Sequence, residues 1–510
     1  PHSTMLRARC AARNLWRISQ RRSSAVAQQY PLVKFEKEDV DTVMAELPAF
    51  NFYEFKDTAP NPYRHTTLDR SILLDSPEPV LSAPKVEVSQ LENGLRVASI
   101  DKQGLMSRLS LHVHAGSRFE NSSNFGVSHM VSMLSYSSTA HLSQLRTVKT
   151  LEQLGANSTT SCKAGREEIT YRIDMLREFV PLAVPLMIGN VLFPRLLPWE
   201  VKASHKTVKE AAAALEKDPV AVVHELLHKA AFCNNTLGLA TRASDRSISY
   251  FTPETIRSYL LDHFAPERMV LVGLNVSHKE LSKWAMRSFA DYNAIPMRKR
   301  VETPALYTGG ELYLDGGSHK LCHLAIAFEG VSSRSPELPT AAVLQSLLGG
   351  GQASSNIGSG VTTRLSTALI KQSPFVESCT AFNRSYSDTG LFGIYGSFEA
   401  TKAGDLSLQI CKALLGLPKV SEEELAKAKA LLKGKLFRHL DNDAALVQDL
   451  GSQLTLSNSY RSPQDLAQAI DAVTAEQVSA LAKRFLSGRP TVAAYGDIHG
   501  LPHVSVFERA

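Results

Sequence analysis

The chain repeats the order of its elements, and this internal duplication constrains its fold more than any other feature. The helical segment that starts with Glu200-Val-Lys-Ala-Ser-His-Lys matches Glu424-Leu-Ala-Lys-Ala-Lys-Ala. Further along, Thr252-Pro-Glu-Thr-Ile matches Thr474-Ala-Glu-Gln-Val, and each match runs into a short apolar stretch that ends in glycine. Matching elements in the same order predict two homologous α+β domains, in each of which helices pack on an open sheet.

Local patterns place the elements within this frame. Alternating apolar and polar residues predict strands at 91–100, 107–114 and 168–174, and helical spacing predicts helices at 125–137 and 145–154. Pro and Gly cluster near the join of the two repeats. The predicted order is a targeting segment at 1–30, an N-terminal extension at 31–90, a first domain at 91–295, a linker at 296–312 and a second domain at 313–510.

The N-terminal segment has the composition of a targeting sequence. Residues 1–30 contain six arginines and no acidic residue, which is typical of a mitochondrial transit peptide, although a basic tail for acidic partners is the alternative. Without these arginines the rest of the chain is close to neutral, so nucleic-acid binding is not predicted. Residues 31–90 are rich in Pro and aromatics, and an extended arm and a mobile linker are equally compatible with them.

Bulk composition excludes several classes of protein. Six scattered cysteines without a C-x-x-C pair favour reduced thiols in an intracellular compartment. The most apolar stretch, 179–193, is interrupted by Pro, Gly and Asn, so no transmembrane helix is predicted. Any association with a membrane is therefore expected to be peripheral.

The first candidate for chemistry is the helical stretch that contains His129. An inverted zinc-peptidase motif needs His-x-x-Glu-His on one helix and a downstream glutamate as third ligand. Ser132 stands at the position of the water-activating carboxylate and Met133 at that of the second histidine, while Glu210 has the spacing of the third ligand. With two ligands of three and no base, the sequence predicts an inactive remnant, with no catalytic residue and no bound metal.

The second candidate is His224-Glu225-Leu-Leu-His228, which satisfies the zincin pattern H-E-x-x-H. A zincin needs a further ligand beyond this helix, but residues 229–250 contain no His and no Glu. An independent zinc protease and an amphipathic helix with histidines at its margin are the two interpretations. The missing ligand favours the helix.

A glycine-rich segment follows a helical pattern at 337–348, and no Lys-Ser/Thr follows its glycines, so a phosphate loop is not predicted. A peptide-binding loop and a long mobile loop remain as alternatives. Its glycines are Gly349, Gly350, Gly351, Gly358 and Gly360. Nearby, His319 and His323 share one face of a predicted strand and Cys322 points to the other face, so a shared site is not predicted. With no haem or iron–sulfur spacing either, no cofactor is predicted.

Five stretches carry a family resemblance. They are AGSRFENSSNFGVSHM at 115–130, PWEV at 198–201, FAPERMVLVGLNVSH at 264–278, AFNRSYSDTGLFGIY at 381–395 and GSQLTLSNSY at 451–460. They resemble the pitrilysin-type domains of the mitochondrial processing peptidase clan, and within it the core protein 2 family of ubiquinol–cytochrome c reductase, respiratory complex III. The likeness covers about residues 88–500. In the related processing peptidase α subunits a glycine-rich loop handles presequences, and residues 349–360 resemble that loop in part.

The resemblance implies two pitrilysin-like domains, each with helices on a mixed, largely antiparallel sheet. It also implies a non-catalytic scaffold on the matrix side of the mitochondrial inner membrane. The expected partners are a sister core subunit 1, similar to a processing peptidase β subunit, and the cytochrome b, cytochrome c₁ and iron–sulfur subunits of complex III. The alternative is a non-catalytic processing peptidase α subunit that binds presequence peptides through its glycine-rich loop.

Overall fold

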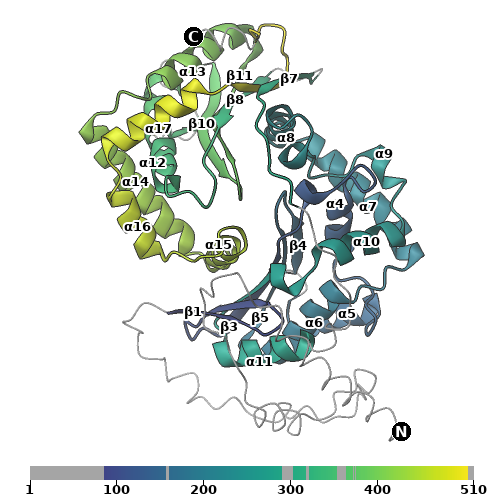
Figure 1. Ribbon diagram of the computed structural model, residues 1–510. Helices are drawn as coiled ribbons and strands as arrows, with labels where there is room; N and C mark the ends of the chain where they lie inside the picture. Colours follow the sequence, from purple (N-terminus) through teal and green to yellow (C-terminus); the bar gives the residue numbers. More distant parts are fainter. Residues whose placement is uncertain are drawn as a thin grey trace, which may run out of the picture.

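The computed structural model describes residues 85–156, 160–289, 302–316, 321–352, 363–370, 373 and 375–503. They form a first half, residues 85–289, and a second half, residues 302–503, each built on a six-stranded sheet (Figure 1). The predicted targeting segment 1–30 and most of the predicted extension 31–90 lie outside the described residues.

The first half alternates strands with helices. Its strands are β1 (Val86–Gln90), β2 (Arg96–Ile100), β3 (Met106–Val113), β4 (Ser161–Ala164), β5 (Ile169–Leu176) and β6 (Met269–Leu274). Its helices are α4 (Val127–Met133), α5 (Gln144–Gln153), α6 (Val180–Leu192), α7 (Pro198–Glu216), α8 (Pro219–Ala231), α9 (Asp245–Ile248), α10 (Pro253–His263) and α11 (His278–Phe289).

The second half follows the same plan. Its strands are β7 (Gly310–Asp315), β8 (Leu321–Glu329), β9 (Gly350–Gln352), β10 (Val376–Ser385), β11 (Gly390–Glu399) and β12 (Thr491–Gly496). Its helices are α12 (Leu338–Leu348), α13 (Ala403–Leu415), α14 (Glu422–Leu440), α15 (Asp443–Leu456), α16 (Pro463–Asp471) and α17 (Ala475–Ser487).

The duplication predicted from the sequence is present in the strand order. The first sheet runs β1-β2-β6-β3-β5-β4 and the second runs β7-β12-β8-β11-β10-β9. The five strands β2-β6-β3-β5-β4 correspond to β7-β12-β8-β11-β10, because each set has one parallel pair, β2–β6 or β7–β12, followed by antiparallel pairs. The two α+β domains with mixed, largely antiparallel sheets are therefore confirmed.

Matched residues have matched local roles. The side chain of Thr252 accepts the backbone N–H of Thr255 at the start of α10, and that of Thr474 accepts the N–H of Gln477 at the start of α17. A threonine at this position satisfies one of the free N–H groups at a helix start. The repeated Thr-x-Glu sequence therefore marks the same helix beginning in both halves.

The sheets begin earlier than the sequence indicates. β1 pairs along its length with β2 from Val86 onward, inside the segment 31–90 that the sequence assigns to an extension. β7 starts at Gly310, inside the predicted linker 296–312, because it pairs in parallel with β12. Strand pairing with a distant partner fixes both starts, and the local sequence does not contain that information.

Each half contains one helix that packs on the sheet of the other half. α8 follows α7 in the first half but packs on β12, β7 and β8 of the second sheet. Its contribution to this shared core is Val223, Leu227 and Ala231, which meet Ala325 and Ala493 of the second sheet. α15, the equivalent helix of the second half, packs on β3 and β6 of the first sheet (Figure 1).

The contact of α15 with the first sheet is close and mostly apolar. Leu446, Leu450 and Leu454 are buried against the apolar face of β2 and β6. A Cβ atom on Gly451 would lie 2.1 Å from Nε2 of His112 in β3, so only glycine permits this approach. Each sheet is therefore covered on one face by its own helices and on the other by a helix from the opposite half.

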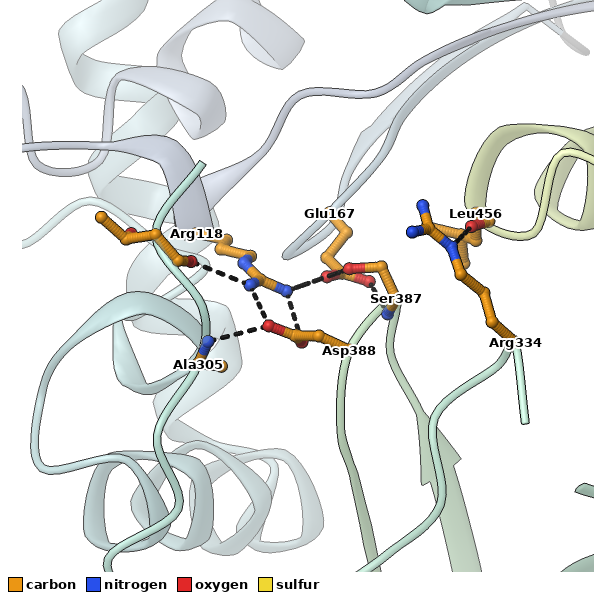
Figure 2. Close-up of polar contacts among 8 residues, drawn as sticks. Arg118, Glu167, Ala305, Arg334, Ser387, Asp388 and Leu456 are labelled. Carbon is orange, nitrogen blue, oxygen red and sulfur yellow. Dashed lines mark hydrogen bonds and ion pairs between the residues drawn. The ribbon is translucent and has the colours of Figure 1, made fainter. Parts of the chain in front are cut away.

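A buried arginine joins the two halves at their centre. The guanidinium of Arg118 pairs with Glu167 of the first half and with Asp388 of the second (Figure 2). It also donates to the carbonyl of Thr303 at 3.1 Å, and Ser387 donates its backbone N–H to Glu167 at 2.9 Å. The Arg118 and Glu167 side chains are only 5% and 3% exposed. We call this group the Arg118 clasp.

The apolar stretch 179–193 forms α6, a helix with Pro185 inside it. Among the described residues no helix is long and apolar enough to cross a membrane.

Candidate functional site

The remnant motif lies on α4, whose start is fixed by a buried carboxylate. Glu120 accepts the backbone N–H groups of Gly126 and Ser128 at 2.7 and 2.8 Å, which caps the first turn of α4. Gly126 has a φ of 86°, and a Cβ atom there would lie 2.6 Å from Cα of Ala243. The glycine therefore allows the loop around residue 243 to lie directly on α4.

That loop lies against both nitrogens of the candidate ligand His129, and the neutral ring accepts a hydrogen bond at one of them. Its Nδ1 is 3.3 Å from the backbone N of Ala243, and its Nε2 is 3.0 Å from a guanidinium nitrogen of Arg242. Burial, followed by the charge of Arg242, lowers the pKa of His129 to about 4, so the ring is neutral at neutral pH. A metal ion on Nε2 would lie about 2 Å from that atom, beside the guanidinium, and the two cations would repel each other.

The other members of the remnant motif serve the fold. Ser132 is buried and donates its hydroxyl to the carbonyl of His129 at 2.7 Å, and Met133 packs against the core of the first half. Glu210 has an exposed side chain, and its carboxylate lies 3.8 Å from the ammonium of Lys206. These residues do not fit a zinc site, since the helix offers one imidazole, already engaged, and no carboxylate to activate water.

In the H-E-x-x-H sequence on α8, both ring nitrogens of the second histidine, His228, have hydrogen-bond partners. Nδ1 of His228 is 2.6 Å from the carbonyl of His224, which can only accept, so Nδ1 carries the proton. Nε2 then accepts from the hydroxyl of Tyr386 in the second half at 2.6 Å. Burial holds the pKa of His228 well below its ordinary value.

Of the other two residues of this motif, Glu225 has partners in its own half and His224 contacts the second half. The carboxylate of Glu225 accepts from the hydroxyl of Thr241 at 2.6 Å and lies 3.1 Å from the guanidinium of Arg166. The ring of His224 stacks on Tyr395 of β11 with centroids 5.9 Å apart. In the described part of the chain, no group of three or more His, Cys, Asp or Glu side chains is placed to hold a metal ion. The motif therefore builds a contact between the halves.

Comparison with known families agrees with this two-part architecture. Residues 96–245 match the family described as Insulinase (Peptidase family M16), and residues 250–432 match the Peptidase M16 inactive domain. The chain belongs to the M16 peptidase family. In this M16 chain, α4 carries His129, Ser132 and Met133 at the spacing of a His-x-x-Glu-His motif.

Several M16 relatives cover most of the chain. The mitochondrial-processing peptidase subunit alpha of Solanum tuberosum is 30% identical over 84% of this chain and 86% of its own length. The cytochrome b-c1 complex subunit 2 of Homo sapiens is 31% identical over 82% of this chain and 91% of its own length. Among solved structures, a chain of Complex III2 from Candida albicans has the same fold, with a TM-score of 0.72, 22% identity, and coverage of 83% of this chain and 99% of that chain.

The glycine-rich segment of this M16 chain has a fixed beginning. Gly349 and Gly350 have φ angles of 61° and 105°, and a Cβ atom on Gly350 would lie 2.0 Å from the carbonyl oxygen of Cys379. β9 pairs Gly350 and Gly351 with β10, and the N–H of Gly350 donates to Thr363 at 3.0 Å. The first three glycines therefore close the base of the segment, while Gly358 and Gly360 lie outside the described residues.

The structure adds site residues that the sequence does not reveal. Arg242 faces His129 from a loop 113 residues further along the chain, and Tyr386 reaches His228 from the other half. No motif or spacing links either pair, so one sequence contains no signal for them. His323, expected not to share a site with Cys322, bonds the hydroxyl of Tyr395 at 2.7 Å, and His319 lies outside the described residues.

Proposed function

We propose that this chain is a non-catalytic core subunit of respiratory complex III, ubiquinol–cytochrome c reductase, on the matrix side of the mitochondrial inner membrane. The observation that carries the proposal is the state of α4. Its single imidazole, on His129, is held by Arg242 and Ala243, and a hydroxyl and a thioether stand at the base and second-ligand positions. An M16 fold that cannot activate water can still act through its surfaces, by binding other subunits.

The relatives are compatible with the complex III assignment, and the resemblance of the stretch 381–395 favours it. The human cytochrome b-c1 complex subunit 2 is covered over 91% of its length at 31% identity. The stretch 381–395, whose sequence resembles the core protein 2 family, includes Ser387 and Asp388 of the Arg118 clasp. The partners proposed are a sister M16 core subunit and the cytochrome b, cytochrome c₁ and iron–sulfur subunits.

The test uses the full chain in mitochondria that express it. An affinity-tagged copy is expected to co-migrate with cytochromes b and c₁ on a native gel, and its depletion should lower ubiquinol–cytochrome c reductase activity. The chain purified without its sister subunit should contain no stoichiometric zinc and cleave no peptide. Absence from the cytochrome b band, with reductase activity unchanged on depletion, would contradict the proposal.

A second function is supported by the glycine-rich segment and by the potato processing peptidase α subunit, which is 30% identical. In that role the chain would bind presequence peptides for an active sister subunit. Because Gly350–Gln352 form β9 and pair with β10, the informative deletion removes residues 353–360 only. Loss of precursor cleavage by the pair, with the assembly intact, would favour this role, whereas unchanged cleavage would exclude it. A variant with residues 353–360 replaced by a Gly-Ser sequence of equal length is the matched control for loop length.

A further inference from the structure

A pocket opens between α6 and α11, in a part of the first half that neither candidate motif reaches. Its volume is about 350 Å³, and its walls are mainly apolar side chains, among them Leu182, Leu186, Phe193 and Trp284. This volume lies near the lower end of the range for small-molecule sites, so the pocket suits one slender ligand and excludes a two-chain lipid.

The floor of the pocket contains a glycine that the backbone does not require. Gly189 lies inside α6 with an ordinary φ, and a Cβ atom built on it would meet no atom within 4 Å. Glycine destabilises a helix interior relative to alanine, and neither a turn nor a close approach accounts for it here. Its one structural effect is to leave the space above it open.

One buried polar group on the wall is unused. The side-chain oxygen of Asn190 accepts the backbone N–H of Tyr136 at 2.7 Å, which fixes the orientation of the amide. Its amide nitrogen is buried and has no hydrogen-bond partner among the described residues. Buried donors are normally paired, so this one favours a bound water on the wall of the pocket.

The charge on the wall of the pocket is positive. Arg287 lines the pocket with its guanidinium 5.6 Å from the ring centre of Trp284, a cation–π arrangement that orients the charge. Among the described residues no carboxylate forms an ion pair with it. An oriented arginine without a counter-ion beside apolar walls is complementary to an amphiphile with one negative charge.

We propose that this pocket binds a single acyl chain with an anionic head group, that is, a medium-chain fatty acid anion. The hydrocarbon chain lies against Leu182, Leu186 and Trp284, above Gly189, and the carboxylate pairs with Arg287. The site is independent of the proposed function, since it uses no residue of the motif on α4, of the H-E-x-x-H sequence on α8 or of the glycine-rich segment.

The test measures dodecanoate binding to the purified full-length chain by calorimetry, below the concentration at which the probe forms micelles. Gly189→Phe fills the pocket and should abolish binding, while Gly189→Ala, the matched control, adds one methyl group and should retain it. Arg287→Gln should weaken dodecanoate binding about tenfold, as expected for loss of a charge-assisted pair, and leave dodecanol binding unchanged. Unfolding curves of all variants verify that they remain folded.

Three results would overturn the proposal. The first is absence of dodecanoate binding to the wild-type chain, and the second is equal binding to wild type and to Gly189→Phe. The third is binding of dodecyltrimethylammonium, which carries the opposite charge, as tightly as dodecanoate. If Gly189→Phe instead lowers recovery of partner subunits while dodecanoate does not bind, a neighbouring protein fills the pocket and the fatty acid assignment is wrong.

Discussion

Arg118 is a buried charged residue that bridges the two halves. Its charge is buried, and it faces one carboxylate from each half (Figure 2). Burial opposes ionisation of Asp388, but the hydrogen bonds from Arg118 outweigh it and hold the pKa of that carboxyl below its ordinary value. The Asp388 carboxyl is therefore ionised at neutral pH, and removing Arg118 takes the ion-pair partner from both carboxyl groups.

Arg118→Met is expected to lower the free energy of unfolding by about 3–5 kcal/mol, because the buried Glu167 side chain would lose its ion-pair partner. The matched control is Arg177→Met, which removes a similar bidentate pair with Asp101 whose side chains are 38% and 32% exposed. Exposed pairs contribute about 0–1 kcal/mol, so the control should change little. Urea unfolding at pH 7 measures both, and equal small losses would show that the clasp does not stabilise the protein.

At the same scale, the remnant metal site illustrates what a single sequence can predict. The positions of Ser132 and Met133 relative to His129 predict an inactive helix, because the chemistry depends only on residue type and short spacing. Arg242, which opposes a cation on His129, could not be predicted, since its contact depends on how a distant loop lies on α4. The expected third ligand, Glu210, has the right spacing but an exposed side chain.

Helix α8 shows the corresponding problem for an element. Its sequence satisfies H-E-x-x-H, yet the helix belongs to the first half and packs on the second sheet. Helical spacing predicts that α8 is amphipathic, and the missing third ligand removes it from the zincins, but neither fact says which sheet it covers. By contrast, the repeat of α7 in α14 and of α10 in α17 is visible in the sequence, because the order of elements and the matched caps of α10 and α17 are local properties.

Histidines buried in the neutral form make stability depend on pH. Burial lowers the pKa of both His129 and His224 to about 4, and for His224 the charges of Arg384 and Arg166 add to the effect. As the pH falls from about 6.5, the unfolded chain takes up these protons before the folded chain does. Stability is therefore lost between pH 6.5 and 4, by up to about 1.4 kcal/mol per pH unit for each histidine.

His224→Gln should remove one such contribution and make the unfolding free energy less steep with pH over this window. The measurement is urea unfolding of wild type and variant at pH 7, 6 and 5, and the slope with pH decides the outcome, because the substitution also changes the contact with Tyr395. Identical slopes for the two proteins would contradict a ring that stays neutral in the folded state.

For the whole molecule, the exchange of α8 and α15 makes each half depend on the other. Without α15, the first sheet would expose Ala98, Ile100, Val270, Val272 and Leu274 to water. Without α8, the second sheet would expose Ala325, Ala327, Leu391 and Ala493. Each large side chain contributes about 1.5–3 kcal/mol when buried, so exposing the large side chains of the first sheet alone is comparable with the total stability of an ordinary domain.

Residues 85–295 and 296–503, expressed separately, are therefore expected to be insoluble or readily proteolysed, and co-expression of the two should restore a soluble, protease-resistant pair. The matched control extends the first fragment at its C-terminus with a flexible linker and residues 442–457, which supply α15 in cis. That addition should make the first fragment more resistant to proteolysis, because it covers the bare face of β2 and β6, while α8 still lacks the second sheet. If each half alone instead unfolds in a single cooperative transition, the exchanged helices are not needed for folding and the two halves are independent domains.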